Sequence, residues 1–182
     1  MDENNKEILI KDGAHGLSTF MSYPILTSVA KLQEERLALR MMKEYYGGML
    51  SVGATTFWED FDVNWLKNAS RIDELPSDEK VDIHGDYGLY CYKGYRHSFC
   101  HGWSAGPVAF LAEYVLGIRV MEAGGKKIML CPELCDLDYA KGSYPTKYGI
   151  VSVEWRKKGD RAVLTNLVCP KEVDIIFDGS IV

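Results

Sequence analysis

The spacing of apolar residues changes along the chain, and this change limits the folds that the chain can adopt. Up to about residue 119, apolar residues recur three and four positions apart, which is typical of helices with one buried face. After Gly124 and Gly125 the spacing becomes two, which is typical of strands whose side chains alternate between two faces. We therefore predict a mixed α+β chain, with a helical domain over residues 1–119 and an antiparallel β domain over residues 120–182.

The helical part begins with a predicted helical hairpin. Its first helix covers residues 17–32, where Pro24 is expected either to kink the helix or to start it anew. Its second helix covers residues 34–46 and is expected to stop at Gly47 and Gly48. Because the break between the two helices is short, we expect them to pack antiparallel.

A third helix and a set of strands complete the predicted elements. Pro107 opens the third helix in the favoured first position, and Gly117 closes it. Four strands follow from the alternation of apolar residues, and they cover residues 127–130, 150–155, 162–168 and 173–177. The turn at residues 157–160 is typical of a hairpin, so the strands are expected to form an antiparallel meander or sandwich.

Charge and composition exclude several classes of partner. The net charge of -5 over 182 residues lacks the excess of Lys and Arg that phosphate binding needs, so we expect neither a nucleic acid nor a membrane as partner. The polar N-terminus carries no secretion signal, and no apolar run approaches the roughly 20 residues that span a bilayer. We expect a soluble protein of the cytoplasm or periplasm. The five cysteines are an odd number and are expected to be reduced thiols.

One stretch, GATTFWEDFD at residues 53–62, carries the most chemical information. It places Trp58 directly before three acids, Glu59, Asp60 and Asp62. An indole beside a carboxylate is typical of a sugar site, because the ring covers the apolar face of the sugar while the acid binds hydroxyls or transfers protons. The same residues also fit the start of a helix with an acidic, solvated first turn. The stretch alone does not decide between the two.

Residues 102–106 match the G-x-S-x-G pattern of a serine nucleophile. In that fold the catalytic histidine follows the serine, whereas every histidine of this chain precedes Ser104. The residues before the motif also lack the apolar strand that the nucleophile elbow requires. A serine hydrolase is therefore not expected.

Metal binding is the weaker interpretation of two further pairs. His97 and His101 stand four positions apart, and Cys131 and Cys135 have the spacing C-x-x-x-C. Neither pair has the further ligands of a zinc site, so a structural zinc is only the alternative to ordinary buried thiols. We expect no metal and no cofactor.

The polar passage over residues 67–94 has no clear period and is long for a loop inside a compact domain. Its tyrosines either line a binding groove or cover a core edge, and the sequence leaves both open. They are Tyr87, Tyr90 and Tyr92, with Tyr95 directly after the passage.

Several ordered motifs resemble one known family. In chain order they are DGAHGL (12–17), YYGGML (45–50), GATTFWE (53–59), SFCHGWSAGP (98–107), VLGI (115–118), LDYAKGSYPTKYG (137–149) and VSVEW (151–155). The first five resemble the end of the catalytic domain of bacterial α-L-rhamnosidases, glycoside hydrolase family 78, and the last two resemble the C-terminal β-sandwich of the same enzymes. The resemblance covers nearly the whole chain.

The resemblance implies an (α/α)6 barrel that hydrolyses terminal α-L-rhamnosides with inversion. Glu59 matches the general base of the family, and His101 matches a histidine that lines the sugar pocket. Trp58 and Trp103 are candidates for the aromatic walls, and Asp60 is a further candidate for contact with the sugar.

The general acid of the family lies far upstream of these motifs. With three predicted helices of the twelve in such a barrel, the chain is expected to be a C-terminal fragment that is inactive alone. Its uncovered helix faces are expected to bind an upstream catalytic half or a second copy. The alternative is a non-catalytic carbohydrate-binding or structural module derived from such an enzyme. In both cases the expected ligand is a rhamnose-containing glycan.

Overall fold

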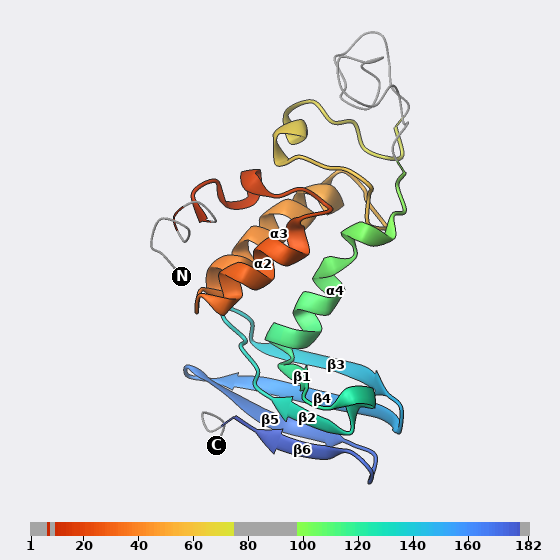
Figure 1. Ribbon diagram of the computed structural model, residues 1–182. Coiled ribbons are helices and arrows are strands. Elements are labelled where there is room, and N and C mark those ends of the chain that lie inside the picture. Colours follow the sequence, from red (N-terminus) through yellow and green to blue (C-terminus); the bar gives the residue numbers. More distant parts are fainter. Residues whose placement is uncertain (1–6, 8–9, 75–97, 179–182) are drawn as a thin grey trace. The chain divides into compact units, whose positions relative to one another are not determined.

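The structure is a computed structural model that describes residue 7 and residues 10–74 and 98–178. The chain forms two compact units, Met1–Pro107 and Val108–Val182. Helices dominate the first unit and strands dominate the second (Figure 1). The mixed fold class predicted from the sequence is therefore confirmed, while the predicted domain limit at residues 119 and 120 stays a prediction.

A helical hairpin forms the base of the first unit. Its two helices, α2 (Ser22–Lys31) and α3 (Glu35–Ser51), lie side by side (Figure 1). Pro24 falls in the first turn of α2, where its missing N–H costs nothing, so the proline starts this helix anew. Residues 32–34 alone connect the helices, which requires them to run antiparallel, as predicted.

The predicted stop of the second helix at its glycine pair is wrong, because α3 continues through Gly47 and Gly48 to Ser51. A Cβ atom on Gly48 would lie 3.0 Å from Leu66 Cδ1 and 3.2 Å from Phe61 Cζ. The missing side chain thus lets the following segment pack closely on the helix. This packing outweighs the low helix propensity of glycine.

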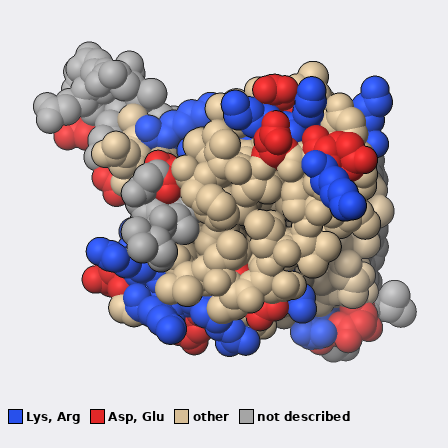
Figure 2. Space-filling view, turned by 90° about the horizontal axis from the view of Figure 1, so that it is seen from below, with Lys and Arg blue, Asp and Glu red and all other residues tan. Residues whose placement is uncertain are grey.

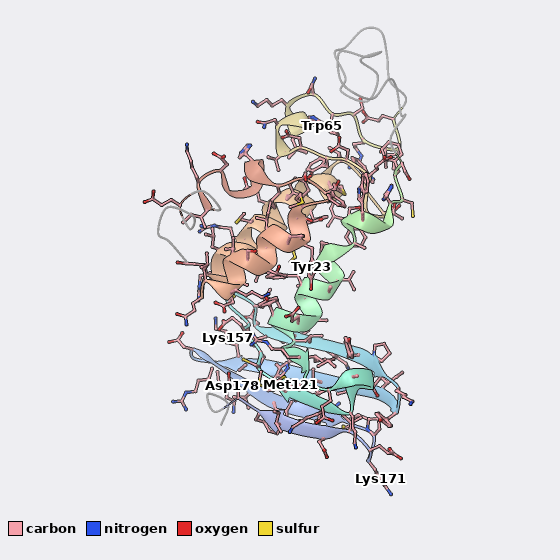
Figure 3. The ribbon with its side chains drawn as sticks, viewed as in Figure 1. Tyr23, Trp65, Met121, Lys157, Lys171 and Asp178 are labelled. Atoms are coloured by element: carbon pink, nitrogen blue, oxygen red, sulfur yellow. The ribbon has the colours of Figure 1, made fainter. Side chains whose placement is uncertain are left out.

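Aromatic side chains fill the core of the first unit. The ring of Phe61 lies 5.2 Å from that of Tyr45, 6.2 Å from that of Trp58 and 6.1 Å from that of Trp65. Trp65 is labelled in Figure 3, in the segment beyond the hairpin. The short helices of this unit are η1 (Gly13–Gly16), η2 (Val63–Lys67) and η3 (Gly102–Ser104).

The third predicted helix is present and changes its winding halfway. Its first part is α4 (Gly106–Phe110), and its second part is the π-helical turn η4 (Leu111–Val115). The wider turn is closed by the N–H of Leu116, which donates to the carbonyl of Leu111 at 2.8 Å.

The second unit contains two three-stranded sheets within the described residues. The first has the order β1 (Ile118–Val120), β2 (Lys127–Leu130) and β6 (Asp174–Phe177), and the second has the order β3 (Tyr139–Thr146), β4 (Gly149–Lys158) and β5 (Arg161–Val168). The second sheet is an antiparallel meander, as predicted. The first and last predicted strands are not part of it, because β2 and β6 lie in the other sheet, where they pair in parallel with each other.

Strands β1 and β3 were not predicted from apolar alternation. β1 has only three residues, too few to show a period, and it lies where the helical part was expected to end. β3 contains Gly142 and Pro145, which are depleted in strands. Pro145 is tolerated because β3 is the edge strand of its sheet.

The core of the second unit rests on β4. Val151, Val153 and Trp155 point to one face of this strand and are buried. The indole Nε1–H of Trp155 donates to the carbonyl of Leu116 at 3.0 Å, which satisfies its polar atom inside the core.

Charged side chains of both signs are mixed on the surface. On the face drawn in Figure 2, Lys and Arg lie beside Asp and Glu around a broad uncharged area, and neither sign covers the face alone. Of the helices in the described part of the chain, none has the length and hydropathy needed to cross a membrane.

Gly117 is the glycine at which a side chain is expected to cost most. Its φ is +70°, and a Cβ atom there would lie 2.2 Å from the backbone carbon of Cys131. We expect Gly117→Ala to lower the free energy of unfolding by more than about 3 kcal/mol, measured by urea denaturation. Gly159→Ala is the matched control, because Gly159 has a φ of +58° but open space around it. It is expected to cost only about 1–2 kcal/mol, and equal losses would contradict the steric argument.

Candidate active site

Two segments far apart in the chain lie side by side and bring the predicted site residues together. The N–H of Glu59 donates to the carbonyl of Ser98 at 2.8 Å, and the N–H of His101 donates to the carbonyl of Phe57 at 2.7 Å. These bonds resemble a short antiparallel ladder. They place the WED stretch (residues 58–60) beside the HGW stretch (residues 101–103). The two motifs that the sequence pointed to therefore lie together in the structure.

Glu59 is fixed at its backbone and at its side chain. Its carboxylate Oε2 accepts from the N–H of Ser98 at 2.7 Å. Its carbonyl accepts from the hydroxyl of Thr19 and from the indole Nε1–H of Trp103, the latter at 2.7 Å. Among the residues that the structure describes, the second carboxylate oxygen, Oε1, accepts no hydrogen bond. One carboxylate oxygen is therefore held by a backbone N–H.

His101 is oriented by the turn that follows it. Its Nδ1 accepts from the N–H of Trp103 at 3.4 Å, and it caps the short helix η3 in this way. In a neutral imidazole whose Nδ1 accepts, Nε2 carries the proton, and this tautomer is inferred from the hydrogen bond. The Nε2–H is then the donor that His101 offers to a ligand.

Trp103 presents part of its ring to solvent. Its side chain is 43% exposed and its ring centroid lies 4.1 Å from that of His101. Phe20 packs edge-to-face on it at 5.4 Å and is 59% exposed. The sequence analysis did not single out Phe20, because an aromatic residue at helical spacing is ordinarily part of a core.

Trp58 is placed differently from Trp103. It is 0% exposed, and its ring lies 4.9 Å from that of Phe99. In the described structure it supports the segment that carries Glu59 and offers no open face to a sugar. Its predicted contact with the sugar stays a prediction.

Asp60 is half-buried, and its Oδ1 accepts from the N–H of Phe61 at 2.9 Å. Burial raises the pKa of Asp60, the hydrogen bond from Phe61 opposes this, and the nearby carboxylates of Asp62 and Glu59 raise it further. Asp60 is therefore the acid of this stretch whose charged form is disfavoured by its surroundings.

The serine and metal interpretations find no support in the described residues. Ser104 is fully buried, and its hydroxyl donates to the carbonyl of His101 at 2.8 Å. No group of three or more potential metal ligands occurs among the described residues. Cys131 and Cys135 are free thiols, and burial together with a hydrogen bond to Asp178 raises the pKa of Cys131 to about 11. The other predicted candidates lie outside the described residues, namely His97, Tyr87, Tyr90, Tyr92 and Tyr95.

Glycine also positions the helix that follows the site. A Cβ atom on Gly106 would lie 2.5 Å from Cβ of Tyr23, so the start of α4 packs directly on α2 at this point. Figure 3 labels Tyr23 on its helix. This close approach brings Ser104 next to the hairpin, and sequence reasoning had noted Gly106 only within the G-x-S-x-G pattern.

The site combines an oriented carboxylate with a histidine and a half-exposed indole. Residues 117–176 match the family model described as the bacterial alpha-L-rhamnosidase C-terminal domain. A comparison with curated proteins gives no significant match.

Solved structures extend the similarity to nearly the whole chain. The family 78 rhamnosidase of Bacillus sp. GL1 is 24% identical over 96% of this chain, with a TM-score of 0.65. The α-L-rhamnosidase of Dictyoglomus thermophilum is 21% identical over 95% of the chain, with a TM-score of 0.65. The enzyme of Streptomyces avermitilis, solved with L-rhamnose, is 19% identical over 86% of the chain, with a TM-score of 0.60.

The chain spans only 14–17% of the length of these enzymes. The comparisons confirm the predicted resemblance to the C-terminal portion of bacterial α-L-rhamnosidases.

The raised pKa of Asp60 gives a test of its surroundings. The native state binds this proton more tightly than the unfolded chain, so the stability of the wild type falls as the pH rises between the unfolded and the folded pKa. Asp60→Asn is therefore expected to raise the urea midpoint at pH 7, and the gain is expected to vanish below the unfolded pKa of about 3.9.

Asp73→Asn is the control for this measurement. Asp73 is exposed, and its carboxylate accepts from Arg71 at 3.0 Å, which lowers the pKa of Asp73. Asp73→Asn is therefore expected to lower the urea midpoint at pH 7, and only slightly. A urea midpoint of Asp60→Asn equal to that of the wild type at pH 7 would contradict the conclusion that the charged form of Asp60 is disfavoured.

Proposed function

We propose that this chain is the base-bearing portion of an inverting glycoside hydrolase that acts on terminal α-L-rhamnosides. The observation that carries the proposal is the fixation of Glu59 at its N–H, its carbonyl and one carboxylate oxygen by residues from three other parts of the chain. Catalysis gains from a base whose position is set before the substrate arrives. A surface glutamate without such a role has no need of this fixation.

In the proposed mechanism Oε1 of Glu59 takes a proton from the water that attacks the anomeric carbon. Oε2 keeps its hydrogen bond with the N–H of Ser98, which holds the carboxylate while the proton moves. Inversion needs a second carboxyl group, acting as general acid, about 6.5–9.5 Å from the base. We propose that this acid is supplied by a part of the whole enzyme outside the present 182 residues.

Three neighbouring side chains are proposed to contact the sugar. His101 donates through Nε2–H to a hydroxyl, and Trp103 covers an apolar face of the ring. Asp60 accepts from a further hydroxyl. The ring of Trp58 packs inside the unit and supports the segment that carries Glu59. Carbohydrate as the ligand class agrees with the similar structures, one of which contains L-rhamnose.

A second candidate is a carbohydrate-binding module without catalysis. It is favoured by the exposure of Trp103 and Phe20, which together offer an aromatic surface without any need for an acid. The two functions differ in whether the charge of Glu59 matters for turnover, because binding alone does not need a base.

The turnover test uses the isolated chain first. It is expected to bind L-rhamnose in an NMR titration but to release no product from an aryl α-L-rhamnoside. His101→Ala is expected to weaken binding about tenfold by removing a donor. Glu44→Gln, a change of an exposed acid on α3, is expected to leave binding unchanged. Hydrolysis by the isolated chain would contradict the proposed division of acid and base.

The role of the base is tested with the upstream catalytic portion restored. Glu59→Gln is then expected to lower kcat by a factor of about 10² to 10⁴ while KM changes little. An unchanged kcat would leave Glu59 as a structural acid and favour the binding module.

The mass of the chain in solution tests its proposed partner. Large apolar side chains of the first unit are also exposed outside the proposed sugar site, namely Met21, Leu50 and Leu66. We propose that an upstream half covers them in the whole enzyme and that copies of the chain associate through them when it is absent. Light scattering is expected to show a mass that rises above 20.5 kDa with concentration, and Leu50→Ser is expected to reduce this rise. A constant monomer mass would contradict the proposal.

A further inference from the structure

A closed series of polar contacts at hydrogen-bond distance runs through the first unit and links the proposed base to the proposed sugar-binding histidine. We call it the hydrogen-bonded ring. Its members are Thr19, Ser22, Tyr46, Glu59, His101, Trp103 and Ser104. They come from the segment before α2, from α2 and α3, and from the two motifs of the site.

One half of the ring passes through the helical hairpin. The hydroxyl of Thr19 donates to the carbonyl of Glu59, and the carbonyl of Thr19 accepts from Ser22 Oγ at 3.1 Å. Ser22 Oγ lies 2.6 Å from the phenol oxygen of Tyr46. All three of these polar side chains are buried, with exposed fractions of 2%, 0% and 7% along the series.

The other half returns through the HGW motif. The phenol of Tyr46 donates to the carbonyl of Ser104 at 3.0 Å, and Ser104 Oγ donates to the carbonyl of His101 at 2.8 Å. Trp103 connects the histidine to the base, because its N–H donates to Nδ1 of His101 and its indole N–H donates to the carbonyl of Glu59.

The number of protons makes the bonds of the ring dependent on one another. Ser22 and Tyr46 have one hydroxyl proton each, yet they take part in three contacts: with Thr19, with each other and with Ser104. At most two of these three contacts are therefore hydrogen bonds at one time, and the proton position at one contact sets the proton positions at the others. Burial raises the pKa of Tyr46 and the bond with Ser22 opposes this, so the phenol keeps its proton and remains a donor.

Tyr46 is the member that connects the separate parts of the ring. It reaches from α3 to Ser22 on α2 and to Ser104 beside the site, at sequence distances of 24 and 58 residues. Removal of its hydroxyl takes one contact from Ser22 Oγ and one from the carbonyl of Ser104, and the lost contact at Ser104 frees the HGW motif to shift.

We propose that Tyr46 is a positioning residue that sets where His101 stands relative to Glu59. The inference rests on the roles proposed above for those two residues. Tyr46 itself touches no reacting atom in this scheme. It acts through the buried ring, and its effect is on the geometry of the site.

The neighbouring residue supplies a matched control. Tyr45 is also buried on α3, and its hydroxyl donates to the carbonyl of Phe61, outside the ring. Tyr45→Phe and Tyr46→Phe remove the same atom from adjacent positions of one helix. Both are expected to lower the melting temperature, so stability alone does not separate a positioning role from a packing role.

The experiment follows the indole N–H of Trp103 by ¹⁵N–¹H NMR, with the signal assigned by its loss in Trp103→Phe. Tyr46→Phe is expected to move this resonance and to weaken L-rhamnose binding about fivefold. Tyr45→Phe is expected to change neither. An unmoved Trp103 resonance in Tyr46→Phe, or an equal shift in Tyr45→Phe, would overturn the inference.

A second pair of variants covers the case in which Tyr46→Phe does not fold. Thr19→Val removes the donor to Glu59 and keeps the shape, whereas Thr19→Ser keeps the donor. Thr19→Val is expected to move the Trp103 indole N–H resonance, whereas Thr19→Ser is expected to leave it at its wild-type position. An equal Trp103 resonance in the two variants would overturn the inference. A wild-type chain that shows no response to L-rhamnose would defeat the proposed function, and the Trp103 resonance would still decide the role of the ring.

Discussion

The carbonyl of Glu59 accepts two hydrogen bonds from two separate segments, and the arrangement of the first unit depends on this junction. Thr19 approaches from the segment before α2, and Trp103 approaches from the turn before α4. Segments at opposite ends of the unit thus meet on one backbone atom. The two donors hold the backbone of Glu59 from separate segments, and its carboxylate is placed with it.

Aromatic packing and the hydrogen-bonded ring have separate tasks around this junction. The rings of Tyr45, Phe61 and Trp58 supply nondirectional burial, which stabilises the fold but tolerates small shifts. The hydrogen bonds of Tyr46 add direction, since their strength falls when distance and angle change. The consecutive tyrosines on α3 place the two kinds of interaction at adjacent positions of one helix.

The sequence predicted those parts of the structure that depend on local patterns. The hairpin, the helix after Pro107 and the β4–β5 hairpin around the turn at 157–160 follow from spacing and turn residues, and the WED and HGW motifs follow from composition and family resemblance. The role of Thr19 was not predictable, because its partner Glu59 lies 40 positions away and no local pattern marks the pair. The predicted helix stop at Gly48 was wrong for the same reason, because the contact of Gly48 with Leu66 is a tertiary one. The parallel pairing of β6 with β2 is likewise decided by contacts between strands distant in sequence.

The hydrogen bonds that fix Glu59 all arise between residues 19 and 103, so this half of the site is ordered by the chain itself. In the proposed mechanism, binding energy from a sugar then need not be used to order the proposed base, which favours its use on the transition state. An acid delivered by another part of the enzyme has to meet only one requirement, which is its distance from a base already in place. The division of an inverting site between a preorganised base and a separate acid is therefore physically reasonable. It explains why the hydrogen bonds around Glu59 connect so many segments of the first unit.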